Sequence, residues 1–329
     1  MGTSEGEFLA WAGEERDRGV KVLVTGGAGF IGSHVARAYL EAGHQVAVVD
    51  SLAGTGRNRT PKGASFHRMD IRDPGLADVF GAERPEVVSH HAAQANLRRS
   101  LEDPISDAEI NVLGTLRLLE LAARHAVRQF IFASTAGALY GEPAALPVSE
   151  DDLIRPTSPY GFHKYLGEQY LEYYQRNHGL GTVVLRYANV YGPGQDPSTE
   201  AGVIAIFTRA FLAGQEPTVF GAGTQTRDFV YVGDVAEANV RVLGRSISAP
   251  LHISTGIETS VNELATRLQR LAGATVAPRH GPAVPGEVHR ISLANARAQT
   301  VLGWRPRVAL EEGLRLTVEW FKAEGSKLA

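Results

Sequence analysis

The apolar run VKVLVT at residues 20–25 passes directly into GGAGFIG at 26–32, and a stretch of helical character follows at 32–42. Gly26, Gly29 and Gly32 give the spacing G-x-x-G-x-x-G. Glycine there allows a tight turn, close approach of the backbone to a pyrophosphate, and helix–strand contact. With 36 glycines in the chain, about 0.4 such matches arise by chance. The preceding strand and the following helix therefore carry the prediction of a dinucleotide-binding turn.

Asp50 ends the second predicted strand, 18 residues beyond Gly32. That spacing is close to the roughly 20 residues expected for the carboxylate that binds the adenosine ribose. A carboxylate here repels a 2′-phosphate and favours NAD over NADP. Arg57 and Arg59 are the counter-argument, because an arginine can accommodate that phosphate. The plainer alternative is that the turn and Asp50 merely end their strands.

The first 190 residues alternate apolar, β-rich runs with helical patterns. Apolar strands separated by helices indicate a parallel sheet covered on both faces. The predicted fold class is therefore α/β, a doubly wound parallel sheet of the Rossmann type. The predicted strands are residues 20–25, 45–49, 65–69, 87–90, 129–133 and 182–186, and a helical pattern covers 110–124.

The sequence pattern changes after about residue 190, where turn-rich stretches separate short predicted helices. Those helices are predicted at 202–213, 234–243, 260–271 and 310–322, and Ser260 and Glu263 form a capping-box pattern at the third. We expect a polar N-terminal extension at 1–19 and an NAD-binding domain at 20–190, with later returns near 228–255. Residues 191–329 are expected to form mainly a smaller, discontinuous substrate-binding domain.

Composition excludes several classes of protein. The 329 residues include 33 basic and 36 acidic side chains, which gives no electrostatic reason to expect nucleic acid or a membrane surface as partner. The absence of cysteine excludes disulfides, zinc–thiolate sites, iron–sulfur clusters and cysteine nucleophiles, and it fits a cytoplasmic protein. No segment approaches the roughly 20 apolar residues of a membrane span, and residues 1–19 do not resemble a secretion signal. The 11 histidines form no metal-binding motif, so we expect no metal site.

Tyr160 and Lys164 stand four residues apart after Ser158 and Pro159, which can begin a helix. The two side chains would then share one helical face. An adjacent cation lowers the pKa of a phenol toward neutrality, which suits a general base acting on a sugar hydroxyl. Because the chain has five lysines, only about 0.15 matches to Y-x-x-x-K are expected by chance. The alternative is an ordinary exposed pair on a helix.

Several stretches together resemble the extended short-chain dehydrogenase/reductases. They are TGGAGFIGS (25–33), ASTAGALYG (133–141), YGFHK (160–164), LRYANVYGPGQDP (185–197) and GTQTRDFVYVGDVA (223–236). Within that family the chain is most similar to the UDP-glucose (UDP-galactose) 4-epimerases, from about residue 20 to the C-terminal helix. The resemblance implies NAD as cofactor and a nucleotide sugar, a UDP-hexose, as substrate.

The resemblance also implies a role for each matching residue. Tyr160 would be the base, Thr135 would hydrogen-bond the reacting hydroxyl, and Lys164 would bind the nicotinamide ribose and tune Tyr160. The implied cofactor contacts are Gly26, Gly29, Phe30, Ile31, Gly32, Asp50, Asp70, Ile71, Ala92, Ala93, Gln94, Asn111, Tyr160 and Lys164. The implied substrate contacts are Thr135, Tyr160, Asn189, Val203, Phe220, Arg227 and Glu287.

Single assignments have plainer alternatives. Asn189 could simply cap a turn, Arg227 could pair with Asp228, and Asp70 could be an ordinary strand-end residue.

Two features depart from the family pattern. The segment TAGALY (135–140) is one residue longer than the common form. Val284 stands where relatives often carry an arginine toward the diphosphate, and Arg279 or Arg290 could substitute for it.

The implied reaction inverts C4 of the sugar through transient oxidation to a 4-keto sugar, with NAD regenerated in each turnover. A 4,6-dehydratase also oxidises C4, but its family places a carboxylate after the catalytic Thr, where this chain has Ala136 and Gly137. An epimerase or decarboxylase of UDP-uronic acids stays open. A non-catalytic NAD-binding regulator is a remote alternative, because it would be expected to lose Thr135, Tyr160 or Lys164.

The resemblance also implies a homodimer, because family members commonly pair through two helices per subunit. Here those helices correspond to residues 107–124 and 160–176. Leu116, Leu119 and Tyr170 would suit such an interface and would equally suit an ordinary core.

Overall fold

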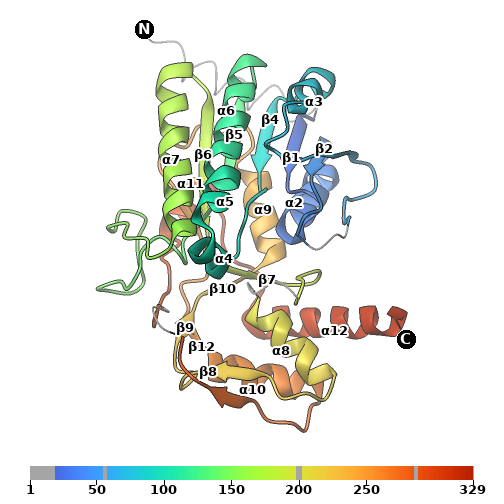
Figure 1. Cartoon of the computed structure of the whole chain (residues 1–329), viewed down its shortest axis with the longest axis vertical. Coiled ribbons are helices and arrows are strands. Elements are labelled where there is room, and N and C mark those ends of the chain that lie inside the picture. Colours follow the sequence, from blue (N-terminus) through green and yellow to red (C-terminus); the bar gives the residue numbers. More distant parts are fainter. Residues whose placement is uncertain (1–18, 55–57, 198–201, 285–287, 329) are drawn as a thin grey trace.

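The computed structural model describes residues 19–54, 58–197, 202–284 and 288–328, and its larger part is a sheet with helices on both faces (Figure 1). In these residues seven parallel strands form one sheet in the order β11-β6-β5-β4-β1-β2-β3. They are β1 (Lys21–Thr25), β2 (Gln45–Asp50), β3 (Ser65–Arg68), β4 (Val87–His90), β5 (Gln129–Thr135), β6 (Gly181–Tyr187) and β11 (Leu251–Ile253). The order reverses between β1 and β4, and ligands of such sheets bind outside the carboxyl ends of the strands at that point. The predicted fold class is confirmed.

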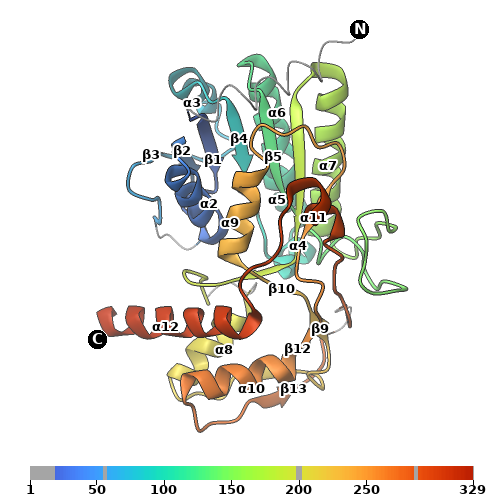
Figure 2. The same cartoon turned by 180° about the vertical axis from the view of Figure 1, so that it is seen from behind.

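Two apolar cores cover the two faces of this sheet. Along β1 the side chains alternate, so that Val22 and Val24 belong to one core and Leu23 to the other. The first core includes residues of α2 (Phe30–Glu41), α9 (Val232–Arg241) and α11 (Ala296–Leu302), seen in front of the sheet in Figure 2. The second includes residues of α3 (Leu76–Glu83), α6 (Thr115–Arg124) and α7 (Pro159–His178). Burial on both faces explains why the strands are continuously apolar in the sequence.

A π-helical turn interrupts the helical pattern predicted at 110–124. The chain forms α4 (Leu97–Glu102), α5 (Pro104–Ala108), the π-helix η1 (Glu109–Gly114) and then α6. Ile71 packs against the backbone at the end of η1, where a Cβ on Gly114 would lie 2.6 Å from Ile71 Cδ1. The predicted helical pattern at 110–124 is present, and its first part lies in η1, because apolar periodicity does not distinguish the wider turn of a π-helix from an α-helix.

Helix α7 begins as predicted. Ser158 is its N-cap, with its hydroxyl oxygen accepting a hydrogen bond from Gly161 N (3.2 Å), and Pro159 occupies the first turn. The helix lies close against the sheet at Gly167, where a Cβ would lie 2.7 Å from the Phe132 ring. Small residues of this kind let the start of α7 sit beside the end of β5.

The smaller part of the molecule lies below the sheet in Figure 1 and is built from the chain after β6. Helices α8, α10 and α12 pack around a third apolar core, and the predicted capping box of Ser260 and Glu263 is confirmed at α10. None of the described helices is long and apolar enough to span a membrane. The elements of this part are β7 (Asn189–Tyr191), α8 (Val203–Leu212), β8 (Thr218–Phe220), β9 (Thr226–Arg227), β10 (Phe229–Tyr231), β12 (Thr259–Ser260), α10 (Val261–Ala272), β13 (Arg279–Gly281) and α12 (Leu310–Leu328).

A buried ion pair joins α7 to β6. Arg186 Nη2 lies 2.7 Å from Glu168 Oε2, and the side chains are 4% and 5% exposed. Ser134 Oγ donates to Glu168 Oε1 (2.5 Å), and Arg186 Nη1 donates to the Tyr140 hydroxyl (2.7 Å). Both charges are thus hydrogen-bonded as well as paired, which is what makes such a pair tolerable in the interior.

We expect Glu168→Gln to lower the free energy of unfolding by about 3 kcal/mol, because Arg186 would keep a buried charge without its counter-ion. Urea denaturation at neutral pH measures this. Glu172→Gln is the matched control: on the same helix it removes an exposed pair with Arg176 and should cost about 0.5 kcal/mol or less. Equal losses in the two variants would contradict the structural role of the buried pair.

Candidate active site

The predicted turn between β1 and α2 forms a cradle of backbone. Gly26 has a φ of +69°, and a Cβ there would lie 2.6 Å from Ala92 N. A Cβ on Gly32 would collide with the carbonyl oxygen of Gly26. No side chain caps the start of α2 at Gly29, so the amides of its first turn, including those of Phe30 and Ile31, are left for an anion. The cradle fits a pyrophosphate as the glycine spacing predicted.

Asp50 is held directly beside this cradle. Its Oδ2 accepts a hydrogen bond from Ala28 N (3.0 Å) and its Oδ1 accepts one from Leu52 N (2.8 Å). The carboxylate therefore stands at the end of β2 next to the glycine turn, where a ribose contact requires it. Arg57 lies outside the described residues.

Asp70 and Ile71 follow β3 at the same edge of the sheet. Arg72 Nε and Nη2 each donate to Asp70 at 2.9 Å, and this hydrogen bonding holds the pKa of the Asp70 carboxyl below its usual value. Ile71 is buried against Gly114 of η1. Ile71 thus packs against the π-turn, whereas the Asp70 side chain is already engaged by Arg72.

Asn111, within η1, holds the loop that follows β4. Its Oδ1 accepts from Gln94 N (3.0 Å) and its Nδ2 donates to Gln94 O (2.9 Å). One carboxamide thereby satisfies both backbone groups of a loop residue that the sheet no longer pairs. Earlier in the same loop, the backbone of Ala92 packs against Gly26, and Ala92 N donates to the Thr25 hydroxyl at 3.4 Å.

Thr135, Tyr160 and Lys164 meet where β5 ends and α7 begins. Thr135 is the last residue of β5, and its side chain acts on the Tyr160 phenol, where it favours a lower pKa. Ser134 points the other way, to Glu168, because side chains alternate along a strand. Lys164 is buried, and its Nζ donates to Ala133 O at 2.8 Å. The alternation along β5 therefore places Thr135, and not Ser134, on the side of the phenol.

The pKa of Tyr160 departs from the value expected from the sequence. Burial, and then the negative charge of Asp107, raise it to about 12, against the hydrogen bond with Thr135. Burial lowers the pKa of Lys164 to about 8, against the charges of Asp107 and Glu168. The expectation of a phenol pKa near neutrality considered only the neighbouring cation, and here desolvation has the larger effect.

Asn189 and Arg227 lie on short strands of the smaller part, β7 and β9. The Asn189 side chain faces the turn after Thr135, since its Oδ1 would lie 3.6 Å from a Cβ on Gly137. Arg227 ends β9, and its Nη1 donates to Thr226 O (2.8 Å). The buried Asp228 carboxylate accepts hydrogen bonds from the chain at 255–256 and 293, which fixes the strand end that carries Arg227.

Two other predicted substrate contacts, Val203 and Phe220, lie on separate segments of the smaller part. Val203 begins α8 and packs against the third core, whereas Phe220 ends β8 with its ring exposed. The guanidinium of Arg98, on α4, lies 5.8 Å from the centroid of the Phe220 ring. Arg98 thus links the sheet part to the smaller part. Glu287 lies outside the described residues.

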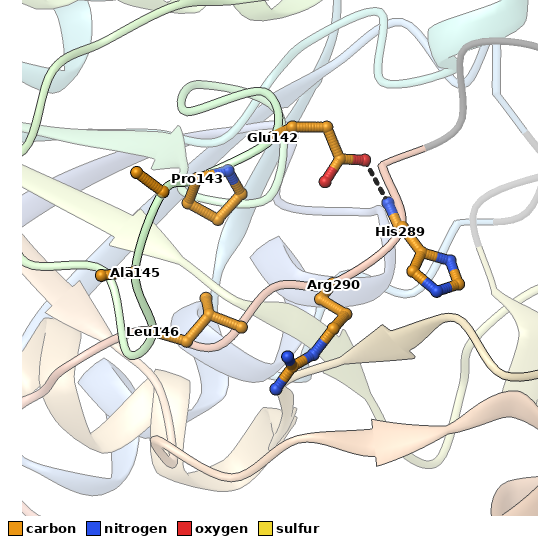
Figure 3. A pocket seen from close by; sticks show the side chains of 7 residues that line it. Glu142, Pro143, Ala145, Leu146, His289 and Arg290 are labelled. Carbon is orange, nitrogen blue, oxygen red and sulfur yellow. Dashed lines mark hydrogen bonds between the residues drawn. The ribbon is translucent and has the colours of Figure 1, made fainter.

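The two arginines considered as substitutes for an arginine at Val284 already have partners. Arg290 donates to both oxygens of Glu258 at 3.0 and 2.6 Å, and Arg279 Nε donates to the Thr218 hydroxyl at 3.0 Å. Arg290 also borders a hollow of about 300 Å³ (Figure 3). The hollow is lined by Glu142, Pro143, Ala144, Ala145, Leu146, His289 and Arg290.

The histidines near the site have structural partners. His90 is buried between the hydroxyls of Thr25 (2.7 Å) and Thr115 (3.0 Å), and His34 Nε2 lies 2.9 Å from Pro193 O. Within the described ranges, no three or more His, Cys, Asp or Glu side chains gather as a metal site.

Sequence reasoning missed Asp107 and His163. Asp107 is buried on α5 and is hydrogen-bonded to both Gln94 (2.7 Å) and His163 (2.6 Å). Two signals were present: Asp107 stands four residues before Asn111, and His163 lies between Tyr160 and Lys164.

Residues 22–254 match the model of the NAD dependent epimerase/dehydratase family. The chain belongs to this family. It is 43% identical to a UDP-glucose 4-epimerase of Mycolicibacterium smegmatis over 310 residues, covering 92% of this chain and 99% of that protein.

Two solved structures of UDP-glucose 4-epimerases are similar to this family member. The enzyme of Thermotoga maritima, solved with UDP-glucose, is 44% identical with a TM-score of 0.90. That of Thermus thermophilus, solved with NAD, is 44% identical with a TM-score of 0.87. Each comparison covers 92% of this chain and 99% of the other.

We expect Gly32→Ala to weaken NAD binding at least about ten-fold, because the added methyl group would push the Gly26 carbonyl out of the cradle. Titration calorimetry with NAD measures the affinity. Gly81→Ala in α3 is the control: a Cβ there meets nothing within 4 Å, so affinity should not change. A folded Gly32→Ala variant with unaltered affinity would show that the cradle does not hold the cofactor.

Proposed function

We propose that this protein is an NAD-dependent epimerase that inverts C4 of a nucleotide-diphosphate sugar, interconverting UDP-glucose and UDP-galactose. The observation that carries the proposal is the grouping of Thr135, Tyr160 and Lys164 beside a glycine cradle at the carboxyl edge of the sheet. The 44% identity to epimerases solved with UDP-glucose and with NAD supports the same substrate and cofactor.

The proposed cofactor contacts lie along one edge of the sheet. The cradle at 26–32 would hold the pyrophosphate, Asp50 the adenosine ribose, and Lys164 the nicotinamide ribose. We assign cofactor binding to residues 20–190 with the returns near 228–255. Residues 191–329 would mainly bind the sugar nucleotide, with Arg227 facing the diphosphate.

In the proposed mechanism, Tyr160 removes the proton from the C4 hydroxyl while Thr135 hydrogen-bonds the same oxygen. When bound, NAD would supply the redox chemistry, as acceptor and then donor of the hydride at C4. Lys164 keeps a positive charge beside the developing phenolate, and Tyr160 gives the proton back in the second half of the reaction. The chain thus contributes positioning and charge stabilisation.

The residues after Thr135 argue against a dehydratase. Elimination of water needs a general acid and base near C5 and C6, and a carboxylate follows the catalytic Thr in enzymes of that type. Here Ala136 is buried and Gly137 faces Asn189. Neither residue can transfer a proton, so reaction beyond the 4-keto stage is disfavoured.

Purified protein incubated with UDP-galactose should form UDP-glucose without added reductant, as measured by chromatography of the nucleotide sugars. Tyr160→Phe removes the base and should slow turnover at least about 100-fold while NAD stays bound. Tyr173→Phe, exposed on the same helix, is the matched control and should leave the rate unchanged. Recovery of intact UDP-galactose, or formation of a 4-keto-6-deoxy sugar, would overturn the proposal.

The protein is further proposed to act as a homodimer. Leu119 is fully buried and Leu116 and Tyr170 pack against the second core, so those three residues stabilise the subunit itself. Ile105, Leu113 and Phe162 are instead each more than half exposed, on α5, η1 and α7, which pack against one another. Exposed apolar side chains on neighbouring helices favour association.

Analytical ultracentrifugation should give the mass of a dimer, and Leu113→Glu should shift it toward the monomer, because a buried interface disfavours an unpaired charge. Leu153→Glu, which alters an exposed leucine outside these helices, should leave the mass unchanged. A monomeric parent protein would refute the dimer.

A further inference from the structure

One buried carboxylate connects two segments of the site. Asp107, on α5, is 1% exposed. Its Oδ1 accepts a hydrogen bond from Gln94 Nε2 (2.7 Å), in the loop after β4. Its Oδ2 lies 2.6 Å from His163 Nδ1, on α7. A buried charge with both oxygens engaged by different segments restrains those segments relative to each other.

The Gln94 end of this connection is unusually well fixed. Asn111 holds the backbone of Gln94 at both its N–H and its C=O, and Asp107, four residues earlier, holds the side chain. Gln94 Oε1 in turn accepts from Asn96 N (2.7 Å). At Gln94 the loop over the glycine cradle is therefore held by α5 and η1, whereas its first residues are bonded to Thr25 of β1.

The His163 end lies within the catalytic turn of α7. His163 stands three residues after Tyr160 and directly before Lys164. A carboxylate accepts and cannot donate, so Nδ1 of His163 carries the hydrogen of this bond. Helix α5 packs against α7, and the bond sets the rotation of the first turn of α7 against α5.

We propose that Asp107 is a positioning residue for the reaction: its carboxylate ties the cofactor-side loop at Gln94 to the turn of α7 that carries Tyr160 and Lys164, and it sets a fixed negative charge beside both. This inference rests on the proposed epimerase function.

The charge of Asp107 acts on both reacting groups in the same direction. It raises the pKa of Tyr160, after burial, and it raises the pKa of Lys164 against the lowering effect of burial. The charge of Asp107 thus favours the Lys164 ammonium and disfavours the Tyr160 phenolate. Activity needs the phenolate and the ammonium together, so both pKa values bound the pH range of the reaction.

The other charged groups around the site differ from Asp107 in what they face. Glu168 raises the pKa of Lys164 and not that of Tyr160. Burial, and then the charge of Lys164, lower the pKa of His90 and of His91, which keeps both neutral. Glu109, on η1, pairs with Arg72 on the surface. Asp107 is thus the carboxylate that acts on both catalytic groups.

Asp107→Asn tests the charge. Asparagine retains an oxygen for Gln94, and it can donate to His163 if the imidazole changes tautomer. Removing the charge lowers the pKa of both Tyr160 and Lys164, so we expect the whole pH–rate profile to move about one unit to lower pH. NAD affinity should stay within about three-fold, because the bond to Gln94 is kept.

Two control variants separate charge from geometry. His163→Asn keeps a hydrogen-bond donor near Asp107 and leaves the negative charge of Asp107 in place. The pH–rate profile should therefore not move along the pH axis. Glu109→Gln removes a carboxylate of the next turn that faces away from the site, and the profile should again stay in place.

Asp107→Ala tests the tie itself. Gln94 Nε2 loses a charged acceptor, and we expect NAD affinity, measured by calorimetry, to fall about ten-fold.

Two results would overturn the proposal: an Asp107→Asn profile that superimposes on that of the parent after scaling, or NAD affinity unchanged in a folded Asp107→Ala. The calorimetric result needs no turnover. If the parent protein does not convert UDP-galactose, the proposed function fails, and the affinity of the Asp107 variants still decides whether the tie exists.

Discussion

Two hydrogen bonds between the Asn111 carboxamide and the backbone of Gln94 fix the loop that follows β4 and packs against the glycine turn. A loop that leaves a parallel sheet carries donors and acceptors which the sheet no longer pairs, and burial makes unpaired groups costly. Asn111 supplies one donor and one acceptor from within a π-turn, where the wider helix changes which residues face the sheet. The fixed loop places the Ala92 backbone against Gly26. It also places the Gln94 side chain where it can donate to Asp107.

Features governed by short-range sterics could be predicted from the sequence. Contacts within the turn and with the adjoining loop require the glycines at 26–32. Their spacing can therefore be recognised in the amino-acid sequence. Ser158 with Pro159, and Ser260 with Glu263, mark helix starts because each cap is formed by residues a turn apart. The strands were found because burial on both faces leaves them continuously apolar.

Features that depend on long-range contacts could not be predicted. The raised pKa of Tyr160 comes from burial and from Asp107, which the fold brings to α7 from a distant segment, so the neighbouring Lys164 gave the wrong direction. Ser134 and Thr135 are both hydroxyl residues, and only the pleat of β5 decides which one meets Tyr160. Likewise Arg290 is engaged by Glu258, a pairing that no local pattern reports.

In the proposed reaction, the hydride removed from C4 returns to the same carbon. Conversion of UDP-galactose carrying deuterium at C4, followed by NMR of the UDP-glucose formed in ordinary water, tests it most directly. We expect deuterium to be retained at C4 of the product, because Tyr160 would exchange only the hydroxyl proton. Replacement of the deuterium by solvent hydrogen would contradict transient oxidation by a retained cofactor.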